Sequence, residues 1–266
     1  MEKSFFFTLG ISLSCIVLSA CSASPNSATK TSDGNESIVH SKNFKSANEL
    51  SKSVVAILSH RQDGQALCTG SILSENMILT AAHCVDGEPA QIELIFANDI
   101  KTATATQKRR VSCFAQNPFW RHPNTSRQGD LALLYFSGGL PSGYIPTELA
   151  PRTEKVIEGA TVYFLGYGVT SGKKRIGSGV LRSTSTTVVG EQSPTEVITD
   201  GQKTSVCFGD SGGPAFIENN GHWFQWGVAS SVLNQDCNEA SIHTAVMLYE
   251  TWIRNTSAKL ISMGSK

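Results

Sequence analysis

The hydrophobic and polar positions divide the chain into three stretches. An apolar run extends from Phe5 to Leu18, directly after Lys3. Residues 22–37 are mostly Ser, Asn, Thr, Ala, Gly and Pro, with scarcely an apolar side chain. From Val54 onward, short runs rich in Val, Ile, Leu, Tyr and Phe alternate with Gly, Asn, Asp and Pro. This last pattern is typical of an all-β barrel or sandwich.

Several short segments of the third stretch have the composition of β-strands. They are SVVAIL, GSIL, MILTAA, IELIF, DLALLYF, TVYFLGYG, AFI, FQWGVASSV and HTAV. Helical periodicity is clear only near the C-terminus, where Leu248, Tyr249, Trp252 and Ile253 share one face. We therefore predict a β domain that ends in a helix at about residues 247–260.

The length of the third stretch leaves two arrangements open. Roughly 229 residues follow Ser37, which is enough for one large β domain or for two small barrels that share an interface. No internal repeat is strong enough to decide between them. The stretch from Gly138 to Pro151 is rich in Gly and Pro and is the best candidate for a linker.

The first stretch has the features of an export signal over residues 1–20. Its apolar run is too short to span a membrane comfortably. It ends in Leu18-Ser19-Ala20-Cys21, which resembles the lipobox of bacterial lipoproteins. That resemblance implies removal of the signal before Cys21, acylation of this cysteine and, from Ser22, sorting to an outer membrane. The alternative is an ordinary cleaved signal.

The polar stretch that follows, residues 21–37, is predicted to be a flexible tether or propeptide. Its few apolar side chains cannot bury enough surface to offset the entropy of ordering the chain. The whole sequence has 22 basic and 22 acidic residues. This balance gives no indication of nucleic acid or of an anionic surface as a partner.

The chemistry is concentrated in three segments. In TSVCFGDSGGPAF, residues 204–216, Ser211 lies between an acidic residue and two glycines. A serine hydroxyl needs a base within hydrogen-bond reach, and that base needs an acid to hold its tautomer. LTAAHC ends an apolar run with His83, and GDLALLYF places Asp130 directly before another apolar run. A carboxylate buried there needs a partner.

Taken singly, such a histidine or aspartate is more often structural than catalytic. Together, TAAHC, Asp-Leu-Ala-Leu and GDSGGP resemble the chymotrypsin and trypsin family of serine endopeptidases, over about Ile38 to Ile253. The resemblance implies an all-β fold of two six-stranded antiparallel β-barrels with a C-terminal α-helix. The protease domain would span residues 38–266, with barrels at about 38–140 and 152–246.

The resemblance also implies a role for each matching residue. Ser211 would attack the scissile carbonyl, His83 would take and return the proton, and Asp130 would orient the imidazole. The N–H groups of Gly209 and Ser211 would form the oxyanion hole. Ser230, in VASS, falls where the family has a serine that lines the substrate cleft.

The cysteine content fits an oxidising compartment. Seven cysteines, less Cys15 in the signal and the acylated Cys21, leave five, of which one must be unpaired within the chain. By the resemblance, Cys68 would pair with Cys84, and Cys207 with Cys237. Cys113 is left over, and we interpret it as a small buried hydrophobe rather than a reactive thiol.

The same resemblance gives an expectation about the substrate. Ser205 occupies the base of the primary specificity pocket, where trypsin-like members carry aspartate, so we expect no preference for Lys or Arg. Val232 and Ser241 align with positions that are glycine in deep pockets. This set resembles elastase-like members, which accept small or medium aliphatic residues before the cut bond. The alternative is chymotrypsin-like acceptance of larger apolar residues.

Activation is a further expectation. In the family, a new N-terminus released by cleavage pairs with the aspartate before the nucleophile, which is Asp210 here. The segment ESIVHSKN offers Ile38 as that terminus, although His and Ser replace the family's two glycines after Ile-Val. Cleavage after Ser37 would also release the enzyme from a lipid anchor at Cys21. The alternative is a coincidental Ile-Val pair.

Two other functions are weighed against a protease. Gly209 to Gly213 also satisfy G-x-S-x-G, the nucleophile elbow of α/β-hydrolase esterases, but that fold requires a helix after the serine and a later acid and histidine. The second alternative is a lipid-anchored binding protein on a catalytically silent protease scaffold. Labelling of Ser211 by a phosphonate inhibitor would separate it from an enzyme.

No metal or other cofactor is expected. Residues 96–107 lack the paired glutamates of the family's calcium loop, and Asp99 is the only acid there. The expected partners are protein or peptide substrates, and a membrane only through a lipidated N-terminus. We expect an exported monomer, either anchored at an outer membrane or released after cleavage of the tether.

Overall fold

The computed structural model describes residues 47–61, 64–85, 88–121 and 128–264. The predicted export signal, the acylated Cys21, the tether and the new terminus at Ile38 lie outside the described residues. Among the described residues, no helix is both long enough and apolar enough to cross a membrane.

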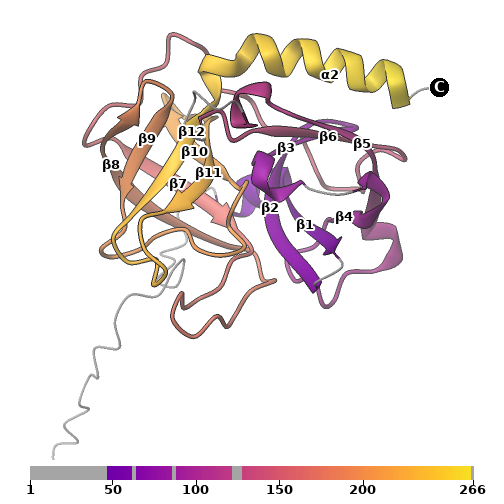
Figure 1. Cartoon of the computed structure of the whole chain (residues 1–266), viewed down its shortest axis with the longest axis horizontal. Coiled ribbons are helices and arrows are strands. Elements are labelled where there is room, and N and C mark those ends of the chain that lie inside the picture. The colour runs from indigo at the N-terminus through magenta and orange to yellow at the C-terminus, as the bar shows by residue number, and fades with distance from the viewer. Residues whose placement is uncertain (1–46, 62–63, 86–87, 122–127, 265–266) are drawn as a thin grey trace, which may run out of the picture. The chain divides into compact units, whose positions relative to one another are not determined.

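The first half of the described chain forms a closed antiparallel barrel with strand order β1-β2-β3-β6-β5-β4 (Figure 1). Its strands are β1 (Val54–Arg61), β2 (Gly64–Ser74), β3 (Met77–Thr80), β4 (Ile92–Ile95), β5 (Lys108–Gln116) and β6 (Ala132–Phe136). The short strands β3, β4 and β6 are almost wholly buried, which agrees with their near-continuous apolar sequences.

The second half forms another closed antiparallel barrel, with strand order β10-β11-β12-β9-β8-β7. Its strands are β7 (Thr161–Gly166), β8 (Arg182–Ser193), β9 (Glu196–Asp200), β10 (Pro214–Asn219), β11 (His222–Val232) and β12 (Ala240–Ala245). The predicted fold class, two six-stranded barrels and a terminal helix, is confirmed. The α/β-hydrolase alternative is wrong, because a strand rather than a helix follows Ser211.

Each barrel has its own core, and a third cluster joins the two. Side chains such as Ile57, Ile78 and Leu133 fill the first barrel. Val162 and Trp226 lie in the core of the second. The third cluster combines residues of both barrels, among them Val54, Ala56, Ile95, Tyr167 and Phe216. Burial of this shared apolar surface stabilises one barrel against the other.

Two α-helices and several 3-10 turns accompany the barrels. The α-helices are α1 (Ala47–Leu50) and α2 (Glu250–Gly264). The 3-10 turns are Ser51–Ser53, Ala82–Cys84, Pro89–Gln91, Ala105–Gln107, Pro118–Arg121 and Val246–Tyr249. Helix α2 lies along β5 and β6 in Figure 1, and its Ile253 and Leu260 belong to the first barrel's core. The last helix of the chain therefore fastens the second barrel to the first.

The terminal helix differs in detail from the prediction. Residues 246–249 form a 3-10 turn, so α2 begins at Glu250 and continues to Gly264. Because the turn changes the direction of the side chains, Leu248 is 41% exposed, although Tyr249 and Ile253 are buried. Leu248 is therefore not on the face that contacts the barrel.

Strands β5, β8 and β9 were not recognised in the sequence. Strand β8, RSTSTTVVGEQS, has mainly polar side chains and irregular exposure, so it lacks a clear apolar alternation. Strand β5 begins with three basic residues, and only Val111 along it is buried. Pairing with apolar neighbours, rather than their own composition, places these segments in the barrels.

Candidate active site

His83 and Asp130 meet because the strands that precede and follow them are paired. His83 lies in the 3-10 turn directly after β3, and Asp130 lies two residues before β6. The pairing of Thr80 with Ala132 brings those two strand ends together. His83 Nδ1 is 2.7 Å from Asp130 Oδ2, and the backbone N–H of His83 donates to Oδ1 at 3.0 Å. Backbone and side chain of the histidine are thus held by one carboxylate.

The carboxylate of Asp130 is completely buried and fully hydrogen-bonded. In addition to the two bonds from His83, the hydroxyl of Ser230 on β11 donates to Oδ2 at 2.6 Å. A buried carboxylate without such donors would carry a large desolvation cost. Because its acceptors are occupied in this way, Asp130 is suited to orient His83 and to stabilise the positive charge of a protonated imidazole.

The turn that carries His83 is supported from the first barrel. The amide of Gln116, at the end of β5, donates to the carbonyls of Ala82 at 2.8 Å and Val85 at 2.6 Å. The indole of Trp120 lies on another side, with its ring centroid 6.2 Å from that of His83. His83 keeps about a third of its side chain exposed, which leaves the imidazole open to a substrate.

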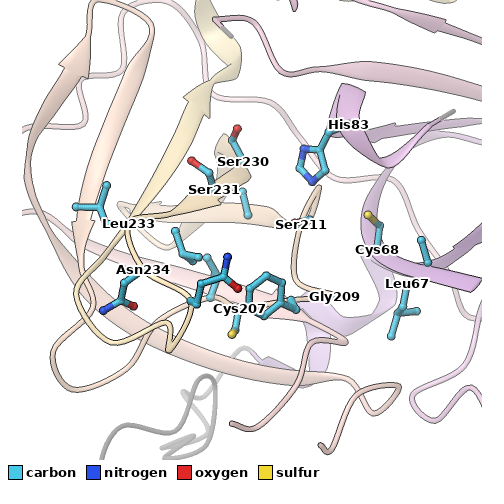
Figure 2. Close-up of a pocket in the computed structure, with 16 residues that line it drawn as sticks. Leu67, Cys68, His83, Cys207, Gly209, Ser211, Ser230, Ser231, Leu233 and Asn234 are labelled. Atoms are coloured by element: carbon cyan, nitrogen blue, oxygen red, sulfur yellow. The ribbon is translucent and has the colours of Figure 1, made fainter. Parts of the chain in front are cut away.

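Ser211 lies in the tight turn before β10 and lines the same cavity as His83 (Figure 2). In the figure, the imidazole points from its turn toward the loop that carries Ser211. No hydrogen bond joins Ser211 Oγ to His83 within the described residues. Such bonds are often long before a substrate binds and tighten in the reacting complex.

The backbone around Ser211 leaves two N–H groups without a partner. From Gly209 to Gly213, the N–H groups of Asp210, Gly212 and Gly213 donate to backbone carbonyls. Within the described part of the chain, the N–H groups of Gly209 and Ser211 donate to no protein acceptor. These are the two donors that the sequence predicted for an oxyanion hole.

Two glycines are required by this turn. Gly209 has φ +100° and Gly212 has φ +80°, in the region that L side chains rarely adopt. A Cβ on Gly212 would also overlap the hydroxyl of Thr80 and crowd the carbonyl of Thr69. The turn can therefore pack closely against β2 and β3 only because no side chain is present at these positions.

Thr69 on β2 connects this turn to the first barrel, a role that the sequence did not indicate. Its N–H donates to the carbonyl of Ser211 and its hydroxyl donates to the carbonyl of Gly209, both at 2.8 Å. The same hydroxyl accepts from the N–H of Tyr167 at 3.1 Å. Thr69 thus fixes the two peptide planes that flank the N–H group of Ser211.

The cavity beside Ser211 has a volume of about 610 Å³ and is uncharged around its wall. Its lining includes Ser230, Val232 and Leu233, together with residues 206–209. None of the described residues that line it is Asp or Glu. An uncharged wall of this kind suits a neutral side chain of the substrate.

Ser205 and Ser241 differ from the expectation that they line this cavity. Both side chains are almost completely buried, and neither residue is part of the lining. Their hydroxyl oxygens are 2.7 Å apart and share a hydrogen bond. Ser205 also donates to the carbonyl of Val206 at 2.9 Å, so Ser241 is the donor to Ser205. The pair lies behind the wall and adds no charge to it.

Arg175 and Phe208 meet at the cavity, a contact that the sequence did not indicate. Phe208 is part of the lining, and the guanidinium carbon of Arg175 lies 3.3 Å from the centroid of its ring. Arg175 also donates to Gln235 Oε1 at 2.6 Å. Since Gln235 lines the cavity from the loop after β11, Arg175 connects two parts of the wall. No short motif identifies such a contact between distant segments.

The two disulfides fasten the segments that carry the site. Cys68 is bonded to Cys84, next to His83, and Cys207 is bonded to Cys237. The sulfurs of the first pair lie near a nitrogen of His83, but disulfide sulfur is no thiolate ligand for a metal. Cys113 is free and half-buried, and burial raises the pKa of its thiol. This cysteine lies outside the cavity lining.

Asp210 is completely buried behind the turn. Its Oδ1 accepts from the N–H of Gly168 at 2.7 Å, and its Oδ2 accepts from the N–H of Cys207 at 2.9 Å. Burial nevertheless raises the pKa of Asp210 to about 7, although these two bonds and the charge of Arg182 oppose the shift. No salt bridge to Asp210 forms within the described residues. A nearby cation would therefore stabilise the ionised form of this carboxylate.

The chain matches the family model named Trypsin over residues 42–253. It is 26% identical over 210 residues to chymotrypsin-like elastase family member 1 of Canis lupus familiaris, which covers 72% of this chain and 81% of that protein. Granzyme M of Homo sapiens is 27% identical over 264 residues, or 93% of this chain and 97% of that protein. Serine protease SP24D of Anopheles gambiae is 31% identical over 209 residues, 73% of each chain. The chain therefore belongs to the trypsin family and is a serine endopeptidase.

Proposed function

We propose that Ser211, His83 and Asp130 are the catalytic triad of this endopeptidase. Protein and peptide substrates follow from the family. The observation that carries the proposal is the combination of a fully hydrogen-bonded His83–Asp130 pair with two unpartnered N–H groups beside Ser211. The pair supplies a base and the N–H groups supply an anion site, both close to the hydroxyl of Ser211. Acyl transfer requires these two elements beside its nucleophile.

In the first half-reaction, Ser211 Oγ attacks the scissile carbonyl and its proton passes to His83 Nε2. The carbonyl π electrons move to oxygen, and the N–H groups of Gly209 and Ser211 bind the resulting oxyanion. Asp130 stabilises the imidazolium. When the oxyanion collapses, the C–N bond breaks, His83 gives its proton to the leaving amine, and the acyl group stays on Ser211.

In the second half-reaction, water replaces the leaving amine. His83 removes a proton from water as the oxygen attacks the acyl carbon, and the same two N–H groups bind the second oxyanion. Collapse breaks the bond to Ser211 Oγ, which recovers its proton from His83. The net reaction is hydrolysis of one peptide bond, with the triad returned to its starting state.

The uncharged cavity supports a preference for a small or medium apolar residue before the cut bond. Val232 and Leu233 supply apolar wall, and the Ser205–Ser241 pair behind it is neutral. The similarity to chymotrypsin-like elastase family member 1 agrees with this preference. Acceptance of larger apolar residues is the second candidate, because a volume of about 610 Å³ also has space for an aromatic ring.

Export, lipidation of Cys21 and activation by a new terminus at Ile38 complete the proposal. The apolar run and lipobox support the first two. The buried Asp210 supports the third, because a carboxylate with a pKa raised to about 7 would gain from an ammonium partner. Cleavage after Ser37 would then both activate the protein and release it from a lipid anchor. Active, trimmed enzyme that stays in the membrane fraction would contradict this coupling.

A fluorescent phosphonate inhibitor tests the triad against the silent binding scaffold. We expect one mole of label per mole of protein, located on Ser211 by peptide mass spectrometry. The Ser211→Ala protein is the matched control and should take no label. Absence of label from protein that cleaves no peptide, even after its terminus has been trimmed to Ile38, would favour the binding scaffold.

A further inference from the structure

A second cavity of about 570 Å³ lies on another side of His83. It shares His83, Ser230 and Ser231 with the first cavity, so one bound peptide can reach both. Trp120 and Glu196 contribute to its remaining wall. The first cavity has no carboxylate in its described lining, whereas this one has a buried acid that the triad does not use.

Glu196 is placed there by the hairpin of β8 and β9. It is the first residue of β9, where it pairs with Ser193 on β8 and with Thr244 on β12. Only 7% of the residue is exposed. Its Oε2 accepts from the hydroxyl of Ser193 at 3.2 Å, and no hydrogen bond within the described residues engages Oε1. Glu196 thus lines the cavity with one carboxylate oxygen that no described donor engages.

This carboxylate has no cation beside it in the described structure. None of the described residues that line the cavity is Lys or Arg. Burial raises the pKa of Glu196, and the nearby negative charge of Asp130 raises it further. Asp130 itself is occupied by three donors, so Glu196 is the acid that can accept a new one. A positive group in the cavity would relieve both the desolvation and the repulsion.

Trp120 adds a second feature that suits a cation. Its indole lines the same cavity and is half-buried. An aromatic face attracts a guanidinium or ammonium group, and it also packs against the aliphatic stem of Lys or Arg. Carboxylate and indole together match a long basic side chain better than a short polar one.

We propose that this second cavity binds a Lys or Arg side chain of the substrate, with Glu196 as the residue that selects it. The inference rests on the proposed function, because it assumes that the residue before the cut bond occupies the first cavity. Ser230 and Ser231 border both cavities, so the basic residue belongs to the same, amino-terminal side of the scissile bond. The enzyme would therefore prefer a neutral residue directly before the cut bond and a basic residue shortly before that one.

The test uses the full chain after its terminus has been trimmed to Ile38, together with peptides that carry valine before the scissile bond. Each of the three preceding positions carries, in turn, lysine or the neutral acetyl-lysine, and kcat/KM is measured for each pair. We expect lysine to be favoured about tenfold at one position, the scale of a hydrogen bond to a charged group. In Glu196→Gln, the ratio should fall to near one. Since the ratio is taken within one variant, differences in the folded fraction cancel.

Glu191→Gln is the matched control, because Glu191 lies on the same hairpin, is exposed and does not line the cavity. It should keep the parent's ratio. Ratios near one at all three positions in the parent, or an unchanged ratio in Glu196→Gln, would overturn the inference while cleavage itself upheld the proposed function.

A binding measurement distinguishes failure of the proposed function from failure of the inference about Glu196. If neither cleavage nor phosphonate labelling occurs, the proposed function fails, and the Ser211→Ala protein is used to bind the same peptides labelled with fluorescein. A Kd about ten times higher for acetyl-lysine than for lysine, lost in the Ser211→Ala, Glu196→Gln double variant, would still support the cavity's selectivity. Equal Kd values would overturn it.

Discussion

Both barrels bury polar side chains, but those without a hydrogen-bond partner are concentrated in the second barrel. Buried polar atoms without a hydrogen-bond partner in the described residues include Gln225 Oε1, Trp226 Nε1, His243 Nδ1 and Thr244 Oγ1, all on β11 or β12. Among the described residues of the first barrel's half, the only buried polar side-chain atom that lacks a partner is Asn117 Nδ2. Two completely buried groups whose pKa values are strongly shifted, His243 and Asp210, also belong to the second half.

The two barrels therefore contribute differently to the site. The first barrel holds His83 and Asp130 in a geometry that three hydrogen bonds fix. The second barrel carries Ser211 and most of the first cavity's wall, next to groups whose charge state depends on their surroundings. We infer that mutations in the first barrel's site chiefly affect the chemical step, and that the second barrel sets the pH dependence of stability.

The largest effect is expected from Asp130→Asn in the first barrel's site. The substitution replaces an acceptor of the Nδ1 proton by an amide, which favours the wrong tautomer of His83. We expect kcat to fall about 10⁴-fold. Ser230→Ala removes one donor to Asp130 but keeps the carboxylate, so its kcat should fall far less. Similar values of kcat for the two variants, with equal thermal stability, would show that the carboxylate does not orient the base.

A substitution of Asp210 tests whether the second barrel sets the pH dependence of stability near neutral pH. Its folded pKa of about 7 lies above the usual 3.8, so the folded state binds the proton more tightly than the unfolded state. Stability from this group is present at low pH and is lost as pH rises through 7. In the unprocessed chain, Asp210→Asn should therefore gain about 4 kcal/mol relative to the parent between pH 4 and pH 8. Urea unfolding at both pH values measures this difference, and a constant difference would refute the assignment.

His243 is expected to make stability depend on pH in the opposite direction. Burial lowers its pKa from 6.5 to about 3, and its ring stacks on Phe164 with the centroids 4.6 Å apart. The folded state holds the neutral ring, so stability is present above pH 6.5 and is lost as pH falls toward 3. At pH 4.5 the loss is about 3 kcal/mol relative to pH 7. His243→Phe should remove this loss in urea unfolding, whereas His222→Phe, at an exposed site, should leave it unchanged.

The smallest effect is expected from Arg175→Ala at the cavity wall. The substitution removes the cation over Phe208 and the bond to Gln235, but it touches neither His83 nor Ser211. We expect KM for a valine peptide to rise about threefold, with kcat unchanged, since a partly exposed cation–π contact contributes about 0.5–1 kcal/mol. A fall in kcat at constant KM would place Arg175 in the chemical step instead.

The fold could be predicted because the strands and the motifs that carry the family resemblance are local patterns in the sequence, and the assignment of the reacting residues from the same motifs stays a prediction. Apolar runs mark β1, β3 and β6, and TAAHC and GDSGGP surround His83 and Ser211 with small residues that a close turn needs. The polar strands β8 and β9 leave no such pattern. They take their place by pairing with β7 and β12, which are far away in sequence.

The cavity walls could not be predicted for the same physical reason. Thr69, Arg175 and Glu196 act through contacts with residues from other parts of the chain, and none lies in a distinctive motif. Ser205 and Ser241 were expected at the wall from an alignment. Their hydroxyls instead pair with each other, and a mutual hydrogen bond of this kind depends on side-chain direction that sequence does not reveal.

The most direct test is a peptide panel that varies only the residue before the scissile bond. It is measured with a protein that begins at Ile38 and with its Ser211→Ala counterpart. We expect cleavage after alanine or valine by the parent alone. Equal cleavage by the Ser211→Ala protein would contradict the assignment of Ser211 as nucleophile, and a preference for lysine or arginine at this position would contradict the neutral first cavity.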